Sequence, residues 1–79
     1  MKLLSNFRSF LLEEDFSINI YKNKIDIINY TSIGQIENDK ITIRYNGGNL
    51  FIKGKNLVVS KLLNDEILIT GIIKNIEFN

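Results

Sequence analysis

The sequence predicts an all-β fold, and three observations support this. From residue 16 onward, apolar and polar residues alternate with a period of two, as in Phe16-Ser17-Ile18 and Ile41-Thr42-Ile43. These segments are rich in β-branched residues, which is typical of strands. Asn and Gly fall between the apolar runs, where turns favour them. We therefore expect a small sandwich, or a partly open barrel or meander, of about seven to eight short strands.

One short helix is expected before the strands. Apolar residues recur at helical spacing between residues 2 and 13, at Leu3, Leu4, Phe7, Phe10 and Leu11. Residues 1–15 are therefore interpreted as an N-terminal helical segment and residues 16–79 as the β part of a single domain. The apolar side of the helix packs on the domain, docks on a partner or lies on a membrane surface; two basic residues make the membrane interpretation the weaker of the last two.

We expect one strand at each of eight apolar groups, taken in chain order. These are Phe16, Ile18 and Ile20; Ile25 and Ile27; Ile33 and Ile36; Ile41, Ile43 and Tyr45; and then residues 50–52, 57–59, 67–69 and 72–78. The triplets 50–52, 57–59 and 67–69 are apolar on both faces. Either the helix or another subunit covers the second face, or the triplets stack in a short β-solenoid, which we keep as the alternative fold.

Glycines mark the expected turns between these strands. Gly47, Gly48, Gly54 and Gly71 are predicted to have a structural role in turns. For Gly47-Gly48 and for Gly54 we expect hairpins in which a positive φ requires glycine. Neither stretch is followed by a helix whose N-terminus could hold a phosphate, so neither is interpreted as a phosphate-binding loop.

Composition restricts the classes of function. The chain has 79 residues, without Cys or His, which excludes disulfides, thiol nucleophiles and the usual zinc ligands. A domain of this size is marginally stable alone, so we expect a homo-oligomer or a protein partner. The chain has ten basic and nine acidic residues, a net charge of +1. A dedicated nucleic-acid binder is usually strongly basic. No signal peptide or membrane span is expected, and the protein is predicted to be soluble and cytoplasmic.

No set of residues predicts catalysis, a cofactor or a metal. Glu37 with Asp39, and Asp65 with Glu66, are interpreted as solvated acids at strand ends. The serines have no histidine to activate them. We therefore expect a protein that is not an enzyme.

A second function is kept open from the residues alone. Tyr45, Phe51, Lys53 and Lys55 combine aromatic and basic side chains, and Phe51 and Lys53 share a face if the strand alternates. That arrangement is typical of a small barrel that binds single-stranded oligonucleotides.

The C-terminal half resembles a known family. The run GGNLFIKGKNLVVSKLLNDEILITGIIKNIEF is similar to the C-terminal signature of the YabP/YqfC family of sporulation proteins, and its spacing is closest to the YqfC branch. The matching positions are residues 50–52, Gly54, Asn56-Leu57, Glu66-Ile67, Gly71 and Phe78. The proline expected before the first strands is missing.

The resemblance implies a non-enzymatic protein of the mother cell. It implies a role in spore envelope, cortex or coat assembly at the forespore surface, through a membrane-anchored sporulation protein of the YqfD or YabQ type. The family has no active site to transfer. The partner surface is predicted from the sequence itself, at Leu4, Phe7 and Leu11 of the N-terminal segment and at Phe51, Lys53 and Lys55.

Overall fold

In the computed structural model, which describes residues 8–13 and 16–79, every regular element is a β-strand. The strands are β1 (Arg8–Glu13), β2 (Phe16–Tyr21), β3 (Lys24–Ile28), β4 (Ser32–Ile36), β5 (Lys40–Tyr45), β6 (Gly48–Leu62) and β7 (Glu66–Phe78). The all-β prediction is confirmed. Within the described ranges, no helix is long and apolar enough to cross a membrane.

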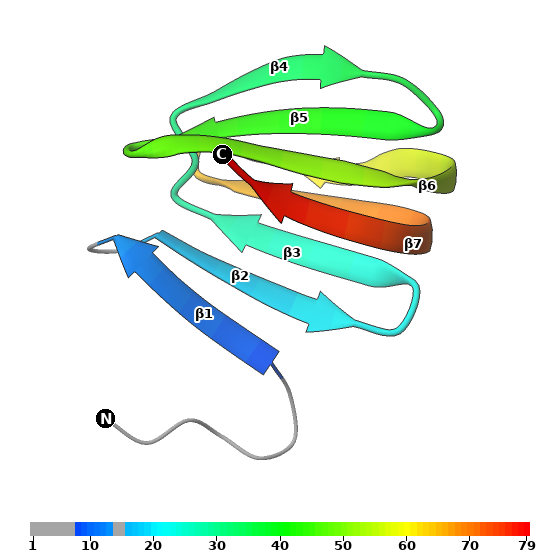
Figure 1. Ribbon diagram of the computed structural model, residues 1–79, viewed down its shortest axis with the longest axis horizontal. Coiled ribbons are helices and arrows are strands. Elements are labelled where there is room, and N and C mark those ends of the chain that lie inside the picture. The colour runs from blue at the N-terminus through cyan, green and yellow to red at the C-terminus, as the bar shows by residue number, and fades with distance from the viewer. Residues whose placement is uncertain (1–7, 14–15) are drawn as a thin grey trace.

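The seven strands form one open sheet in the order β1-β2-β3-β7-β6-β5-β4 (Figure 1). Every neighbouring pair is antiparallel, and only the pairing of β3 with β7 joins strands that are distant in the sequence. A β-solenoid stacks its strands in parallel, so the alternative fold is wrong.

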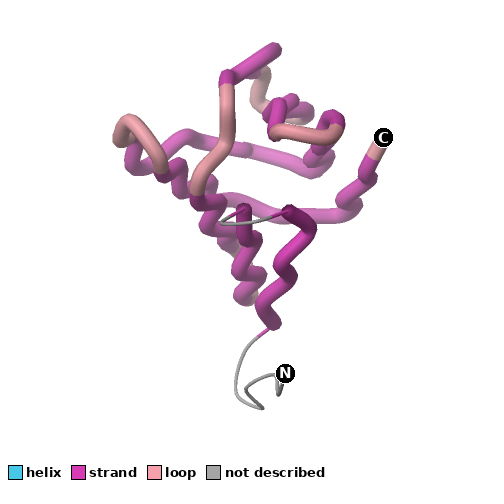
Figure 2. The backbone as a smooth tube through the Cα atoms, turned by 90° about the vertical axis from the view of Figure 1, so that its left-hand side faces the viewer, coloured by secondary structure: helices cyan, strands magenta, loops and turns pink. Residues whose placement is uncertain are grey.

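Two long strands replace four of the predicted short ones. The apolar groups 50–52 and 57–59 belong to the single strand β6, and 67–69 and 72–78 belong to the single strand β7. The β6–β7 pairing contains three register shifts, after Lys53, Lys55 and Val59. Because bulges bend and twist a strand pair, this ribbon folds the sheet over on itself, and Figure 2 shows that the strands do not lie in one plane.

The folded ribbon divides the sheet into two halves. The first half-sheet contains β1, β2 and β3 with residues 66–70 of β7 and 58–62 of β6. The second contains β4 and β5 with residues 48–53 of β6 and 72–78 of β7. Each half presents an apolar face to the other, which is the packing of a sandwich made from one sheet.

The core lies between these two faces. Its buried apolar residues, among those described, are Phe16, Ile18, Ile25, Ile27, Ile41, Ile43, Leu50, Ile52, Leu57, Ile67 and Ile69. Burying each of these side chains stabilises the fold by roughly 1.5–3 kcal/mol. The alternation predicted for Phe16-Ser17-Ile18 is confirmed, because the two apolar residues are buried and the serine is half-buried.

The N-terminal prediction is tested only in part. Residues 2–7 of the helix expected over 2–13 lie outside the described residues, so that part stays a prediction. Arg8–Glu13 run as strand β1, which pairs with β2. The N-terminal helix itself stays a prediction. A sheet edge offers a row of unpaired backbone groups, and β1 satisfies those of β2.

Candidate partner-binding surfaces

The stretch LFIKGKNL forms the bend of β6. Gly54 lies inside the strand and its φ is not positive, so the prediction that it turns a hairpin is wrong. Glycine is needed there for a different reason: a Cβ on Gly54 would collide with the carbonyl oxygen of Ile72 on β7. Asn56 has a φ of 55°, in the left-handed region that Asn tolerates. The bend is therefore a close crossing of two strands.

Gly71 completes the bend from the opposite strand. Its φ is 133°, and a Cβ there would lie 2.6 Å from the carbonyl oxygen of Asn56. Gly47 lies in the turn between β5 and β6 with a φ of 130°, and Gly48 begins β6 beside the backbone of Asn79. Of the four predicted turn glycines, Gly54 and Gly71 thus lie inside strands. Gly54 on β6 lies against the backbone of β7, and Gly71 on β7 lies against the backbone of β6.

Two hairpin turns dock on the bend. The backbone N–H of Gly54 donates to Asp39 at 3.1 Å, and that of Leu57 donates to Asn38 at 2.8 Å. From the other half-sheet, the N–H of Gly71 donates to Asn23 at 3.1 Å. The β4–β5 turn and the β2–β3 turn therefore meet at the same end of the molecule, although they are distant in the sequence.

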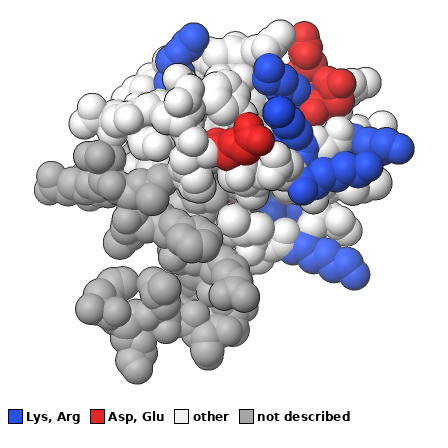
Figure 3. Space-filling view, in the orientation of Figure 1, with Lys and Arg blue, Asp and Glu red and all other residues white. Residues whose placement is uncertain are grey.

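This bent end carries much of the positive charge. Six lysines lie on the segments that meet there, namely Lys22, Lys24, Lys40, Lys53, Lys55 and Lys74. Figure 3 shows basic side chains gathered on the right-hand side of the view, where the bend and the two turns lie in Figure 1. Glu37 and Asp39 lie on the β4–β5 turn and reduce the net charge of this end.

The predicted aromatic and basic set is only partly brought together. Phe51 and Lys53 lie on the outer face of the second half-sheet, because the alternate residues Leu50 and Ile52 are buried. Phe51 is half-buried, with Lys40 Nζ 5.8 Å from its ring centroid. Tyr45 lies on the inner face and stacks on Phe16 with 4.4 Å between ring centroids. Tyr45 therefore cannot join Phe51 in a single stacking platform.

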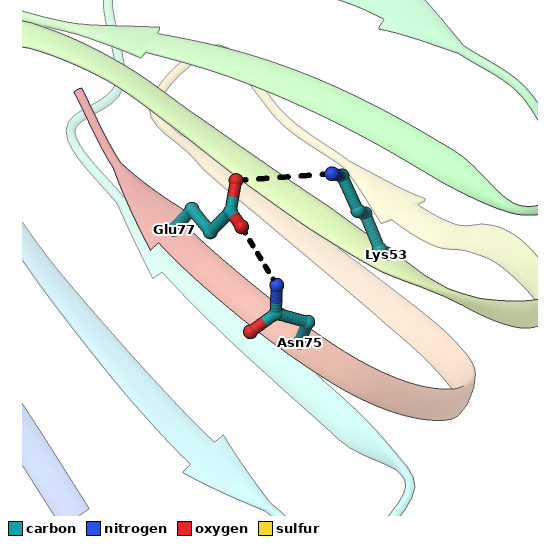
Figure 4. Close-up of polar contacts among 3 residues, drawn as sticks. All are labelled: Lys53, Asn75 and Glu77. Carbon is teal, nitrogen blue, oxygen red and sulfur yellow. Dashed lines mark hydrogen bonds and ion pairs between the residues drawn. The ribbon is translucent and has the colours of Figure 1, made fainter.

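Lys53 is engaged within its own sheet. Its Nζ lies 3.8 Å from Oε1 of Glu77, and Asn75 donates from Nδ2 to Oε2 of the same carboxylate at 2.9 Å (Figure 4). Both partners of the ion pair are about half exposed, so the pair contributes little to stability. Lys55 lies at the bend, where it pairs with Ile72.

The other predicted partner residues lie at the N-terminus. Leu4 and Phe7 are outside the described residues. Leu11 belongs to β1, whose backbone pairs Leu11 with Ser17. The partner surface predicted at Leu4, Phe7 and Leu11 stays a prediction.

A carboxyl pair that the sequence did not indicate lies on the outer face of the first half-sheet. Asp26 on β3 and Glu66 on β7 are diagonal neighbours, because Asp26 pairs with Leu68 and Ile28 with Glu66. Burial, followed by hydrogen bonding and repulsion from Glu66, raises the pKa of Asp26 to about 6. Lys61 lies 3.5 Å from Glu66 and partly offsets this rise. Asp26 therefore holds its proton more readily than an ordinary aspartic acid at mildly acidic pH.

An open apolar groove lies where β4 approaches the end of β6. It has a volume of about 540 Å³ and is lined by Tyr30, Ile33, Leu62, Leu63 and Asn64. The Tyr30 hydroxyl donates to the Leu63 carbonyl oxygen at 2.6 Å. This groove was not predicted from the sequence; its local signal is the Leu62-Leu63 pair beside a turn, and both side chains are exposed.

The described residues contain no cluster of three or more Asp or Glu side chains that could hold a metal ion. The surfaces that remain are the bent basic end, the groove and the open sheet edges. These are features through which a small protein can contact a partner.

Comparison with known proteins gives one match. A family model described as the YabP family matches residues 15–79, which covers most of the chain and all of strands β2 to β7. No curated protein and no solved structure matches the chain.

Proposed function

The chain belongs to the YabP family, and on that basis we propose that it acts in spore formation as a non-enzymatic adaptor or structural protein. The proposal places it in the mother cell at the forespore surface, in envelope, cortex or coat assembly, with a membrane-anchored sporulation protein of the YqfD or YabQ type as partner. The observation that carries this proposal is the family match over residues 15–79. Within the family, the spacing around Gly54 and Gly71 favours the YqfC branch.

The described surface supports an adaptor. Seven apolar side chains are well exposed, namely Tyr21, Ile36, Val58, Leu62, Leu63, Ile72 and Phe78. Exposed apolar groups on a domain this small favour protein contacts. The carboxyl pair of Asp26 and Glu66 lies on the outer face of the first half-sheet, with Lys61 Nζ 3.5 Å from Oε2 of Glu66.

A deletion in the spore-forming host tests the proposal. We expect loss of heat-resistant spores with normal vegetative growth, restored by the wild-type gene. A fluorescent fusion should collect around the forespore, and the tagged protein should co-purify with a membrane protein from sporulating cells. Normal spore yield in the deletion strain would exclude the role.

The N-terminal segment is proposed as part of the partner surface. A variant lacking residues 1–14 should lose the membrane-protein partner, while full-length protein in the same extract retains it. Retention of the partner by the truncated protein would remove Leu4, Phe7 and Leu11 from the surface.

Oligonucleotide binding is the second candidate function. The gathering of six lysines at the bent end favours it, whereas the net charge of +1 and the inward position of Tyr45 count against it. Fluorescence anisotropy with labelled single strands at low salt decides the question. Binding that weakens steeply with salt would support this function, and no binding at high protein concentration would end it.

A further inference from the structure

Strand β4 is a sheet edge whose own residues include no charge and no proline. Among the described strands its only neighbour is β5, so its other side presents unpaired backbone N–H and C=O groups. Natural edge strands are commonly protected by Lys, by Pro, by an inward charge, by a bulge or by being short. The sequence of β4, Ser-Ile-Gly-Gln-Ile, contains no charged residue and no proline.

A bulge places both isoleucines of β4 on the same face. Ile33 pairs with Ile43 and Ile36 pairs with Ile41, with a register shift between them. Ile41 and Ile43 both point into the core, and directly opposed residues share a face. Ile33 and Ile36 therefore both point inward, although they are three residues apart. Ile36 remains 52% exposed.

This arrangement is self-complementary. If two copies of β4 pair antiparallel about a two-fold axis, Ile33 can lie opposite Ile36 of the second copy, and Ile36 opposite its Ile33. The two central positions then bring Gly34 opposite Gln35, which is exposed and polar. Both isoleucine pairs fall on the same face, so a single register covers the exposed apolar side chains of both edges.

The same register also matches charges. One residue beyond Ile36, the exposed Glu37 lies opposite Ser32 of the second copy, and Ser32 is itself paired with the exposed Arg44. Glu37 and Arg44 would then share the outer face across two strand spacings, about 10 Å between Cα atoms. The small Ser32 side chain between them leaves room for contact. The two-fold axis generates this attractive pair twice.

We propose that this protein forms a symmetric dimer through edge-to-edge pairing of β4. The net charge of +1 offers little repulsion between copies. The apolar groove beside Ile33 adjoins the new interface, and Ile36 of the second copy would extend over its rim. The proposal rests on the geometry of β4 and holds independently of the role in spore formation.

Disulfide cross-linking tests the register, because the chain has no cysteine of its own. Opposed residues in an antiparallel pair have Cα atoms roughly 4.5–5.5 Å apart, within the range of a disulfide, roughly 4.4–6.8 Å. An equimolar mixture of Ile33→Cys and Ile36→Cys chains should form a cross-linked heterodimer under mild oxidation. Each variant alone should not, because like positions lie about 10 Å apart.

Sedimentation equilibrium provides a second test with a matched pair of variants. Wild-type protein should approach twice its 9.1 kDa mass as concentration rises. Ile36→Lys should weaken the dimer by at least about tenfold in Kd, because it brings a charge to the paired face. Ile72→Lys changes a side chain that is similarly exposed, 49% against 52%, but lies on β7, so it should leave the dimer intact.

Three results would overturn the proposal: a wild-type monomer throughout the concentration range, equal weakening by Ile36→Lys and Ile72→Lys, or no cross-link in the cysteine mixture. Loss of spores on deletion of the gene, together with any of these, would retain the proposed function and reject the dimer. Dimer formation by the purified protein, together with normal sporulation of the deletion strain, would support the dimer and reject the proposed function.

Discussion

Replacing Gly54 with alanine should lower the free energy of unfolding, because it disrupts the bend where β6 and β7 cross. The added Cβ would lie far inside the 3.0 Å limit that real Cβ contacts respect, against the carbonyl oxygen of Ile72. That oxygen is backbone in a neighbouring strand, so no side-chain rotation relieves the clash. A carbon–oxygen contact needs roughly 3.3 Å, so β6 and β7 would have to separate by more than about 1 Å.

The cost follows from this separation. Forcing an extra carbon into a packed site costs about 1–3 kcal/mol, and each backbone hydrogen bond lost at the bend costs about 1 kcal/mol more. The bond most exposed to the shift is that from the Gly54 N–H to Asp39, at 3.1 Å. Alanine recovers about 0.4–1 kcal/mol through the unfolded chain. The net loss is about 2 kcal/mol, from a total that for 79 residues is about 4–12 kcal/mol.

Urea unfolding followed by circular dichroism measures this loss. With a slope of about 1 kcal/mol per molar for a small domain, the midpoint should fall by about 2 M. Gly34→Ala is the matched control, because its Cβ would meet the Thr42 side chain at 3.3 Å and the Thr42 carbonyl oxygen at 3.4 Å, both outside the 3.0 Å limit. A Gly54→Ala protein within about 0.5 kcal/mol of wild type, or a Gly34→Ala protein equally destabilised, would refute the reasoning.

Three smaller predictions use the same unfolding assay. Because the pKa of Asp26 is raised from 3.8 to about 6, the folded protein holds this proton more tightly than the unfolded chain; the resulting stability is complete below about pH 3.8 and is lost as the pH rises through about 6. Asp26→Asn should abolish that loss and gain about 1 kcal/mol at neutral pH, a modest value because the site is partly solvated; an unchanged pH dependence would contradict this. Ile52→Val, in the core, should cost about 1 kcal/mol, whereas Ile72→Val, half exposed, should cost almost nothing; equal losses would place the core elsewhere. Lys53→Ala should change stability by less than about 0.5 kcal/mol, because its ion pair with Glu77 is solvent-exposed; a larger loss would show that the pair is structural.

Local pattern was enough to predict the strands. The two-residue period of Phe16-Ser17-Ile18 and of Ile41-Thr42-Ile43 placed the apolar members of each in the core, because a strand directs alternate side chains to opposite faces. The same pattern could not reveal that residues 48–62 are one continuous strand. A glycine between two lysines has the local composition of a turn.

Candidate surfaces depended on contacts that no local pattern contains. Asp26 and Glu66 are forty positions apart in the chain and meet only because β3 pairs with β7. Tyr45 and Phe51 looked like one aromatic set, but the β5–β6 turn directs Tyr45 inward to Phe16 and leaves Phe51 on the outer face.

Residue pattern alone predicts that this chain is built from strands, and it carries the match of the C-terminal run to the YabP family. Both depend on residue types at short spacing. The role of LFIKGKNL follows from strand packing: Gly54 lets one strand cross the carbonyl of Ile72, eighteen residues away along the chain. Only the β4–β5 register put Ile33 and Ile36 on one face. Strand register and the close approach of backbones depend on pairing between segments that are distant in the chain. A local sequence pattern does not specify that pairing.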